Sequence, residues 1–314
     1  MTSSPARRPR GPRSSCAGSH ISDEEVSVRM KRVVCLALAL LLLTACGDRP
    51  RAGLSPVAGT KGGTGVNSLE KIRKRGEIVF GVKFDTPPFG SIGQGATEPE
   101  GFEIDLATEV AERLKVRPRF VEVNPKNRVA NLDSGKIDVI TATMIATRAR
   151  DKAIDFSEPY FEDDQRLMVR GDSEITGVGQ LDGRTVALVQ GSTEESVLRD
   201  KAPGAKILSF QSWPTALQSL LRGDADAVST TVGILTGLKS AADKAGEKVK
   251  IVSPGIAQGP LAMGFRQGDA ALRDEVNAAL MGMAEDGAYD RIYTRWWGKV
   301  LPEPYKIRVL PSGA

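Results

Sequence analysis

The chain has 314 residues, 40% of them hydrophobic, which is enough for two domains with packed cores. Its formal net charge is +4, and the whole excess lies in positions 1–45, which hold seven Lys or Arg residues and three acidic ones. The remaining residues are balanced in charge, so composition argues against a nucleic-acid-binding protein.

Residues 1–45 are typical of a cleaved lipoprotein signal segment. A Met-Lys-Arg group at 30–32 precedes an apolar run, Val33–Leu43, about half as long as the ~20 residues of a membrane-spanning helix. The sequence LTAC at 43–46 resembles a bacterial lipobox, in which the cysteine is lipidated and becomes the mature N-terminus. We therefore expect Cys46 to anchor the protein at the extracytoplasmic face of the cell membrane. A weak membrane helix is the alternative, and Met30 is an alternative start.

Cleavage before Cys46 would also exclude several kinds of chemistry. The one histidine, His20, and the other two cysteines, Cys16 and Cys35, all precede that point. A mature protein without them has no Ser-His-Asp triad, no internal disulfide and no Cys/His metal site. No spacing of acidic residues suggests an all-carboxylate metal site, so we expect neither metal nor cofactor.

Residues 46–67 are rich in Gly, Pro and Thr without apolar periodicity, which predicts a flexible tether. The fold then begins near Leu69. Strands and helices alternate from there, which predicts an α/β protein with parallel-type sheets and helices on both faces. The first unit is predicted to contain a helix at 69–75, a strand at 78–82, a helix at 103–114, a strand at 119–123 and a short helix from 128.

A second α/β unit follows a strand at 165–170. Its predicted strands lie at 185–189, 206–209, 227–229, 249–252 and 261–265, and its predicted helices at 193–201, 214–222 and 233–245. Helices near 271–285 and 289–297 complete the fold. Phe84, Phe89 and Trp213 are candidates to line a cleft, although packing in the core or at the surface is favoured for Trp213, as it is for Trp296 and Trp297.

An internal repeat indicates two matched halves. Residues 132–143 (LDSGKIDVITAT) correspond to residues 220–231 (LLRGDADAVSTT), each with a helix end, a glycine, an acidic turn, a strand and a hydroxyl-bearing loop. Because ligands bind outside the carboxyl ends of strands in open α/β sheets, Thr143 and Thr231 are expected to face each other across one cleft. The alternative is that turn-strand units simply recur in α/β proteins.

The stretch 137–160 carries a family resemblance. Gly135, Asp138, Thr143, Thr147 and Arg150, followed by DFSEPY at 155–160, resemble the extracellular amino-acid-binding proteins of ABC importers. A second similar segment, 264–298, comes in the expected order, and the resemblance covers roughly residues 69–298.

The resemblance implies a two-lobed periplasmic-binding-protein-like fold of type II, with two strand crossovers at the hinge. Its boundaries imply residues 69–165 plus 262–300 in the first lobe, residues 166–261 in the second, and a tail at 301–314. The expected crossovers lie near 165–170 and 259–265. We expect a monomer.

In this family the arginine at the position of Arg150 holds the ligand α-carboxylate, and Thr143 assists. A short loop and a guanidinium suit that role, since both offer fixed N–H donors. The resemblance places the turn Gly191-Ser192-Thr193 against the same carboxylate, at a helix start that attracts anions. An exposed arginine and an ordinary helix cap are the alternatives.

Lys83 and Arg128 are the residues expected to determine which charge the site prefers on the ligand side chain. Lys83, with Phe84, lies where histidine-type relatives carry an acid, and Arg128 matches an arginine that glutamate/aspartate-type relatives direct at a side-chain carboxylate. The alternatives are a solvated lysine at a strand end and a charge in the first turn of a helix.

Two positions depart from the family pattern. Relatives usually have an acid at the position of Thr231, which pairs with the ligand α-ammonium, and Ser or Thr at the position of Ile145. A dicarboxylate therefore fits as well as an amino acid.

The sequence thus predicts a lipid-anchored solute-binding protein that closes its lobes on a small acidic ligand such as glutamate, aspartate or a glutamine-like molecule and delivers it to a membrane permease. An enzyme on the same fold, such as a dehydratase or a cell-wall lytic module, is the main alternative, although a poised acid or base is not evident. A receptor that senses its ligand without transport is the third.

Overall fold

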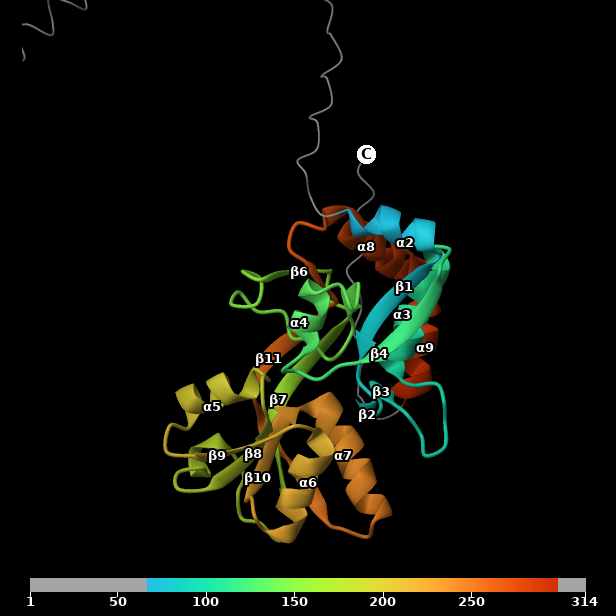
Figure 1. Ribbon diagram of the computed structural model, residues 1–314. Helices are drawn as coiled ribbons and strands as arrows, with labels where there is room; N and C mark the ends of the chain where they lie inside the picture. The colour runs from blue at the N-terminus through green and yellow to red at the C-terminus, as the bar shows by residue number, and fades with distance from the viewer. Residues whose placement is uncertain (1–66, 299–314) are drawn as a thin grey trace, which may run out of the picture. The chain divides into compact units, whose positions relative to one another are not determined.

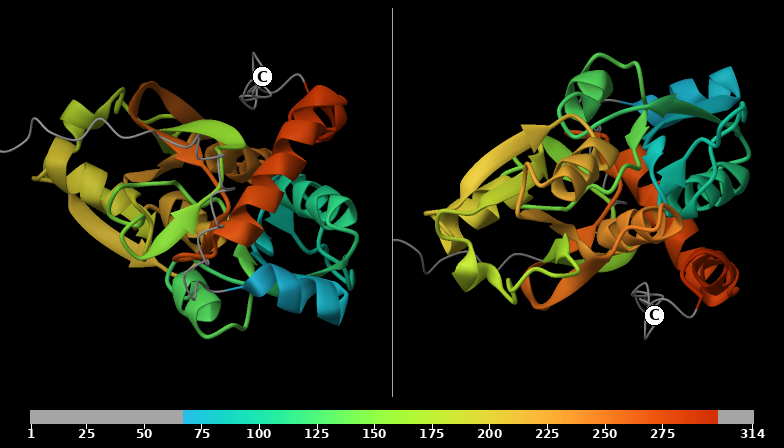
Figure 2. Two further views of the ribbon diagram at one scale, coloured as in Figure 1. Left: turned by 90° about the horizontal axis from the view of Figure 1, so that it is seen from above. Right: turned by 90° about the horizontal axis from the view of Figure 1, so that it is seen from below.

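The computed structural model describes residues 67–298, which lie within the compact unit Gly62–Ala314. The predicted signal segment, Cys46, the tether up to residue 66 and the tail at 301–314 lie outside the described residues. Two five-stranded sheets, each with its own helices, form two lobes (Figure 1). Figure 2 shows the same division from above and below, with the blue and teal elements on one side and the yellow elements on the other.

The first lobe is built on a mixed sheet in the order β4-β1-β5-β12-β6. Strand β1 pairs in parallel with β4 and β5, and β12 pairs antiparallel with β5 and β6. The strands are β1 (Glu77–Val82), β4 (Arg117–Glu122), β5 (Val139–Ile140), β6 (Ile154–Phe156) and β12 (Gly264–Arg266). The helices are α2 (Ser68–Arg75), α3 (Phe102–Arg113), α4 (Arg128–Asp133), α8 (Ala270–Glu285) and α9 (Ala288–Trp296), and a small hairpin joins β2 (Asp85–Thr86) to β3 (Gly90–Ser91).

The second lobe is built on a sheet in the order β11-β7-β10-β8-β9. Its parallel part, β10-β8-β9, matches the predicted α/β unit, and β7 and β11 add an antiparallel edge. The strands are β7 (Phe161–Arg170), β8 (Thr185–Val189), β9 (Lys206–Phe210), β10 (Ala227–Thr231) and β11 (Val249–Leu261). The helices are α5 (Glu194–Lys201), α6 (Trp213–Arg222), α7 (Val232–Lys244) and the 3-10 turn η1 (Val178–Gln180).

Two long strands carry the chain between the lobes. Strand β7 follows β6 of the first sheet, and β11 leads into β12 of the same sheet. The two strands run side by side (Figure 1), paired antiparallel from Phe161 opposite Leu261 to Arg170 opposite Val249. This arrangement confirms the two-lobed fold with two strand crossovers.

The predicted strands at 249–252 and 261–265 are instead one long strand, β11, followed by the short β12. The ladder between β7 and β11 shifts its register between Val252 and Ala257 and then resumes. The interruption contains Pro254 and Gly255, and proline has no N–H to donate to a ladder. A local break was therefore predicted where the strand continues through a bulge.

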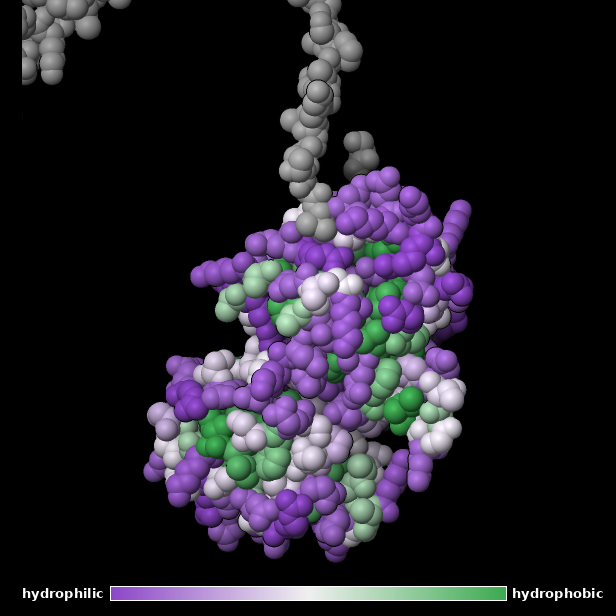
Figure 3. Space-filling view, in the orientation of Figure 1, coloured by the Kyte–Doolittle hydropathy of each residue, from purple (hydrophilic) through white to green (hydrophobic). Residues whose placement is uncertain are grey.

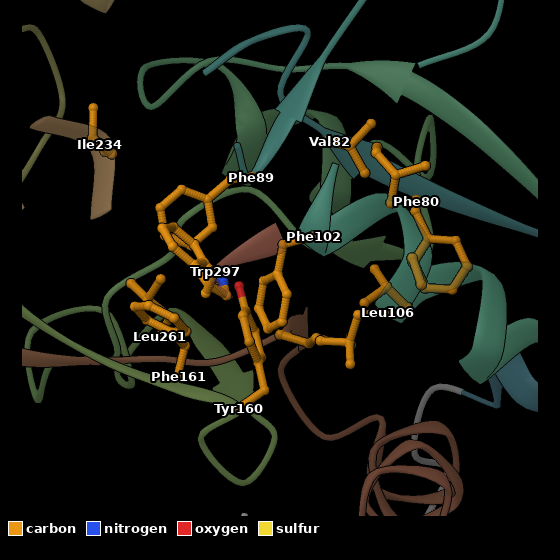
Figure 4. Packing of buried hydrophobic residues seen from close by; sticks show 14 of the residues in the cluster. Phe80, Val82, Phe89, Phe102, Leu106, Tyr160, Phe161, Ile234, Leu261 and Trp297 are labelled. Atoms are coloured by element: carbon orange, nitrogen blue, oxygen red, sulfur yellow. The ribbon is translucent and has the colours of Figure 1, made fainter. Parts of the chain in front are cut away.

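An aromatic cluster fills the first lobe beside the crossover. Phe89, Phe102, Tyr160, Phe161 and Trp297 come from four separate parts of the chain and gather around one another (Figure 4). Their ring centroids lie 5.0 Å apart for Phe89 and Trp297, and most of the pairs meet edge to face, a preferred aromatic geometry. Phe89, a candidate to line the cleft, is fully buried here.

Hydrophilic residues cover most of the face shown in Figure 3. Among the described residues, the large hydrophobic side chains that are exposed are Ile92 and Leu208, each only slightly over a third. No helix between residues 67 and 298 is long and apolar enough to cross a membrane.

Candidate ligand-binding site

A small cavity of about 20 Å³ lies where the two lobes meet. It has room for about one water molecule, which is too little for an amino acid. Two larger hollows, of about 280 and 270 Å³, are each lined by a single lobe. The interlobe cavity is lined by Pro125, Arg128, Thr143, Ile145 and Arg150 from the first lobe and by Ser192, Thr193, Glu194, Trp213, Thr231 and Ile234 from the second.

Arg150 connects the two lobes at this cavity. Its Nη1 donates to the Ile145 carbonyl at 2.9 Å, and its Nη2 donates across the cleft to the Gly191 carbonyl at 3.2 Å. Burial lowers the pKa of Arg150, and the negative charge of Glu194 opposes that change. Both acceptors are neutral carbonyls, which a carboxylate could replace with stronger, charge-assisted bonds.

Arg128 is a second arginine at the same cavity, at the start of α4. It is 2% exposed, and its Nη1 donates to the carbonyls of Ala142 and Thr143. Its Nε has no hydrogen-bond partner within residues 67–298. Burial lowers the pKa of Arg128 to about 9, and the positive charge of Arg150 adds to that effect, so the guanidinium stays protonated at neutral pH.

Neither arginine has a salt bridge in the described part of the chain. Every ion pair within 4.0 Å there joins other residues. A buried charge without a counter-charge is costly. The first-lobe side of the cavity is therefore poised to take up anions.

Thr143 is held in place by a buried carboxylate that the sequence analysis missed. Its φ of 46° lies in the left-handed region, which is uncommon for threonine, and its N–H donates to Glu103 Oε1 at 2.7 Å. The Tyr160 hydroxyl donates to the same oxygen. Complete burial raises the pKa of Glu103 to about 7. Glu103 lies in the first turn of an amphipathic helix, where an acid is ordinary, so its sequence position gave no signal.

The turn at 191–194 forms the second-lobe wall. Gly191 has a φ of 83°, and a Cβ there would lie 3.0 Å from backbone atoms of Pro125 and Lys126, so any other residue would be strained and crowded at this approach. The Ser192 hydroxyl is buried and has no hydrogen-bond partner among the residues described. Thr193 precedes α5 without a side-chain capping bond.

Glu194, the first residue of α5, was not predicted as a site residue. It is 4% exposed, and its Oε1 accepts a hydrogen bond from the Thr230 hydroxyl at 3.0 Å. An acid in the first turn of a helix is usually explained by the helix dipole. The sequence therefore provided no reason to assign Glu194 to the cavity.

Thr231 lies at the start of α7, and its buried hydroxyl faces Asp163 of β7, whose pKa a hydrogen bond from Thr231 lowers against the effect of burial. The next turn is held by Asp163 of β7, whose Oδ1 accepts from the Gly233 N–H at 3.1 Å. Burial raises the pKa of Asp163 to about 7. Asp163 is close beneath Thr231 but does not line the cavity.

The structure brings together most of the predicted residues. Arg128, Thr143, Arg150, Ser192, Thr193 and Thr231 line the cavity, and Gly191 reaches it through its carbonyl. It does not bring Lys83 and Phe84 there. Lys83 is buried, with Nζ 2.8 Å from Asp85 Oδ1, and Phe84 packs against the core. Trp213 is buried and also lines the cavity, so both places considered for it apply.

Comparison with known proteins identifies the family. The model of the bacterial extracellular solute-binding proteins, family 3, matches residues 78–299. The chain belongs to this family. It is 37% identical over 275 residues to the ABC transporter glutamine-binding protein GlnH of Bacillus subtilis (strain 168), covering 85% of this chain and 97% of that protein.

Solved structures of family 3-like binding proteins have the same fold. An ancestral arginine-binding protein bound to glutamine aligns with a TM-score of 0.67 and 36% identity, covering 71% of this chain and 99% of that one. The ancestral amino acid-binding protein AncCDT-1, a precursor of cyclohexadienyl dehydratase, aligns with a TM-score of 0.67 and 31% identity, covering 73% and 99%.

Proposed function

We propose that the protein is the lipid-anchored, substrate-binding component of an amino-acid ABC importer, and that its ligand is a small acidic amino acid such as glutamate. The observation that carries this proposal is the pair of arginines, Arg128 and Arg150, that face one interlobe cavity without salt bridges in the described structure. Two separate cations suit a ligand with two separate carboxylates.

The α-carboxylate is assigned to Arg150. A carboxylate between the lobes would take the place of the Gly191 carbonyl and accept hydrogen bonds from the guanidinium. The Thr143 side chain and the start of α5 line the same space, and the free N–H groups of a helix start favour an anion. One carboxylate would thus join both lobes.

The side-chain carboxylate is assigned to Arg128, whose Nε has no partner in the described structure. The structure makes Lys83 a weaker candidate than the sequence alone suggested. Its side chain lies outside the cavity and already forms an ion pair with Asp85. Glutamine is the second candidate ligand, since both the Bacillus relative and the ancestral structure are named for it or bind it. Its amide oxygen could accept from Arg128 without the charge.

Closure of the lobes supplies the affinity. It removes the ligand and the two arginines from water, and each charge pair becomes stronger because the closed site has a lower dielectric constant. Closure also brings groups of both lobes onto one ligand molecule. A membrane permease is the expected partner that receives the ligand when the lobes open. Strands β7 and β11 are the proposed hinge, with the boundaries of the lobes near residues 165 and 261.

A binding role fits the site better than catalysis. The two carboxyl groups whose pKa is raised to about 7, Glu103 and Asp163, are candidates for acid–base chemistry. Neither lines the interlobe cavity, and each holds a backbone N–H in place. The dehydratase-related structure that this chain resembles is itself named as an amino acid-binding protein.

Titration calorimetry with L-glutamate, L-aspartate, L-glutamine and L-arginine tests the proposal. We expect glutamate to bind most tightly. Glutamine binding more tightly would overturn the acidic specificity and retain amino-acid binding, whereas binding of none of the four would overturn the proposed function.

The anchor has its own test. Mass spectrometry of the protein extracted from membranes should find a mature N-terminus at a diacylglyceryl-modified Cys46. An N-terminus at Met1 or Met30 on the membrane-extracted protein would contradict the anchor without affecting the ligand assignment.

A further inference from the structure

We propose that Glu194 binds the cationic group of the ligand, so that the ligand is an amino acid with an ammonium and not a dicarboxylate that lacks one. This inference rests on the proposed function, because it assigns a third charge in the same cavity. It would also explain how the site can bind an ammonium although position 231 carries a threonine and not an acidic residue.

The burial of Glu194 is the first argument. Its side chain is 4% exposed and lines the cavity, and the Thr230 hydroxyl donates a hydrogen bond to it. No Lys or Arg nitrogen between residues 67 and 298 lies within 4.0 Å of it, since none of the ion pairs there includes Glu194. A buried carboxylate with one neutral donor gains strongly from a positive partner.

Two hydroxyl groups beside Glu194 provide the second argument. The side-chain oxygens of Ser192 and Thr231 line the same cavity and are buried. The Ser192 hydroxyl has no hydrogen-bond partner within residues 67–298, and the Thr231 hydroxyl faces Asp163, so its lone pairs can still accept. A ligand ammonium has three N–H donors and no acceptor. One carboxylate and two hydroxyl oxygens give it three acceptors on one wall.

The charges of the two walls are also arranged for an amino acid. Arg128 and Arg150 come from the first lobe, whereas Glu194 comes from the second. Glu194 lies near enough to oppose the fall in the pKa of both arginines, yet it forms no ion pair within 4.0 Å with either of them. A glutamate molecule with two carboxylates and one ammonium would meet an opposite charge at each of its three groups.

A structural role for Glu194 is the competing explanation. An acid in the first turn of a helix stabilises that helix through its dipole. Glu195 is a matched control, because it occupies the same turn of α5 but pairs with Arg199 at 2.7 Å, outside the cavity. Removing the charge of Glu195 should change the dipole interaction and this exposed ion pair, and should leave the cavity as it is.

The experiment compares ligands that differ only in the ammonium. Calorimetry measures L-glutamate against glutarate, and L-glutamine against its deaminated analogue glutaramate, on wild type, Glu194→Gln and Glu195→Gln. We expect Glu194→Gln to reduce the preference for the ammonium-bearing member at least about tenfold, equivalent to about 1.4 kcal/mol. Glu195→Gln should leave it unchanged. Thr231→Asp in the Glu194→Gln background should restore it, because that position lines the same wall.

The outcomes separate the inference from the function on which it rests. If wild type binds an amino acid and Glu194→Gln weakens both members of a pair equally, Glu194 has only a structural role and the inference is wrong. If wild type binds glutarate as tightly as glutamate, no cation site operates and the inference is again wrong. If no amino acid binds wild type, the proposed function itself fails.

Discussion

The two copies of the repeated segment, 132–143 and 220–231, are built alike until their last residues. In each, a glycine with positive φ, Gly135 or Gly223, ends a helix. In each, an aspartate then accepts the N–H of a neighbouring strand at 2.8 Å, from Val79 in the first lobe and from Thr185 in the second.

The copies differ where they reach the cavity. Thr143 adopts a left-handed conformation and gives its N–H to Glu103, whereas Thr231 is extended and its hydroxyl faces Asp163. The charges come from outside both copies: Arg128 and Arg150 on one side, Glu194 on the other. The repeat therefore supplies a common scaffold, and the neighbouring segments make one wall cationic and the other acidic.

Loss of the cationic wall should have the largest effect. Arg150→Ala removes the guanidinium that reaches both lobes, and loss of one partner of a desolvated charge pair costs on the order of 2–5 kcal/mol of binding. We expect calorimetry to detect no binding of any amino acid. Arg148→Ala is the matched control, because that side chain is exposed and outside the cavity. Retained tight binding by Arg150→Ala would refute its assignment.

The carboxyl groups beneath the two copies should make stability fall as pH rises. Burial raises the pKa of Glu103 from 4.5 and of Asp163 from 3.8, each to about 7. The folded state then binds more protons than the unfolded state, so this stabilisation is complete below pH 4 and is lost as pH rises through 7. For each group the loss between pH 5.5 and 8 is about 2 kcal/mol.

Urea unfolding of the ligand-free protein at pH 5.5, 7 and 8 measures this effect. Glu103→Gln and Asp163→Asn should each flatten the decline by about 2 kcal/mol, and Glu98→Gln, at an exposed position, should not. The hydrogen bonds from Tyr160 and Thr143 and the positive charges of Arg128 and Lys83 lower the pKa of Glu103, but burial outweighs them. A stability that rises from pH 5.5 to 8 would contradict both assignments.

The close approach of the two walls gives a smaller effect. Gly191→Ala would place a Cβ 3.0 Å from the Pro125 and Lys126 backbone at a φ unsuited to alanine, without any change of charge. We expect about a tenfold loss of affinity, or about 1.4 kcal/mol. Gly179→Ala, where a Cβ meets nothing within 4 Å, is the control. Equal affinities of the two variants would show that the turn does not need to approach the first lobe.

Lys83 should have the smallest effect on ligand choice. It pairs with Asp85 away from the cavity, so Lys83→Met should change the ratio of glutamate to glutamine affinity by less than about twofold, or about 0.4 kcal/mol. Arg128→Met should lower that ratio much more, because Arg128 lines the cavity. Calorimetry that finds the larger change in Lys83→Met would reverse the roles of the two residues.

The sequence predicted those elements of the fold that are determined by a few neighbouring residues. The glycines and aspartates of the repeat located β5 and β10, and β8 has the predicted bounds, 185–189. The motif ending at Arg150 located the cationic wall. The continuation of β11 through Pro254 could not be predicted, because it depends on pairing with a strand some ninety positions away.

The missed site residues share one physical cause. Glu103 and Glu194 both lie in the first turn of a helix, where an exposed acid is ordinary. Tertiary packing buries both side chains, and the sequence pattern of one helix does not show that burial. Lys83 is the opposite case, because the sequence predicted a binding residue and the structure shows an ion pair. Its partner is Asp85 in β2, which neutralises the charge of Lys83.

A crystal structure of the protein with its tightest amino-acid ligand tests the central claim most directly. The account predicts that the ligand lies between the lobes, with its α-carboxylate within hydrogen-bond distance of Arg150 and its ammonium facing Glu194. A ligand bound instead in the hollow between α3 and α9, beside Asp105 and Arg295, would contradict it.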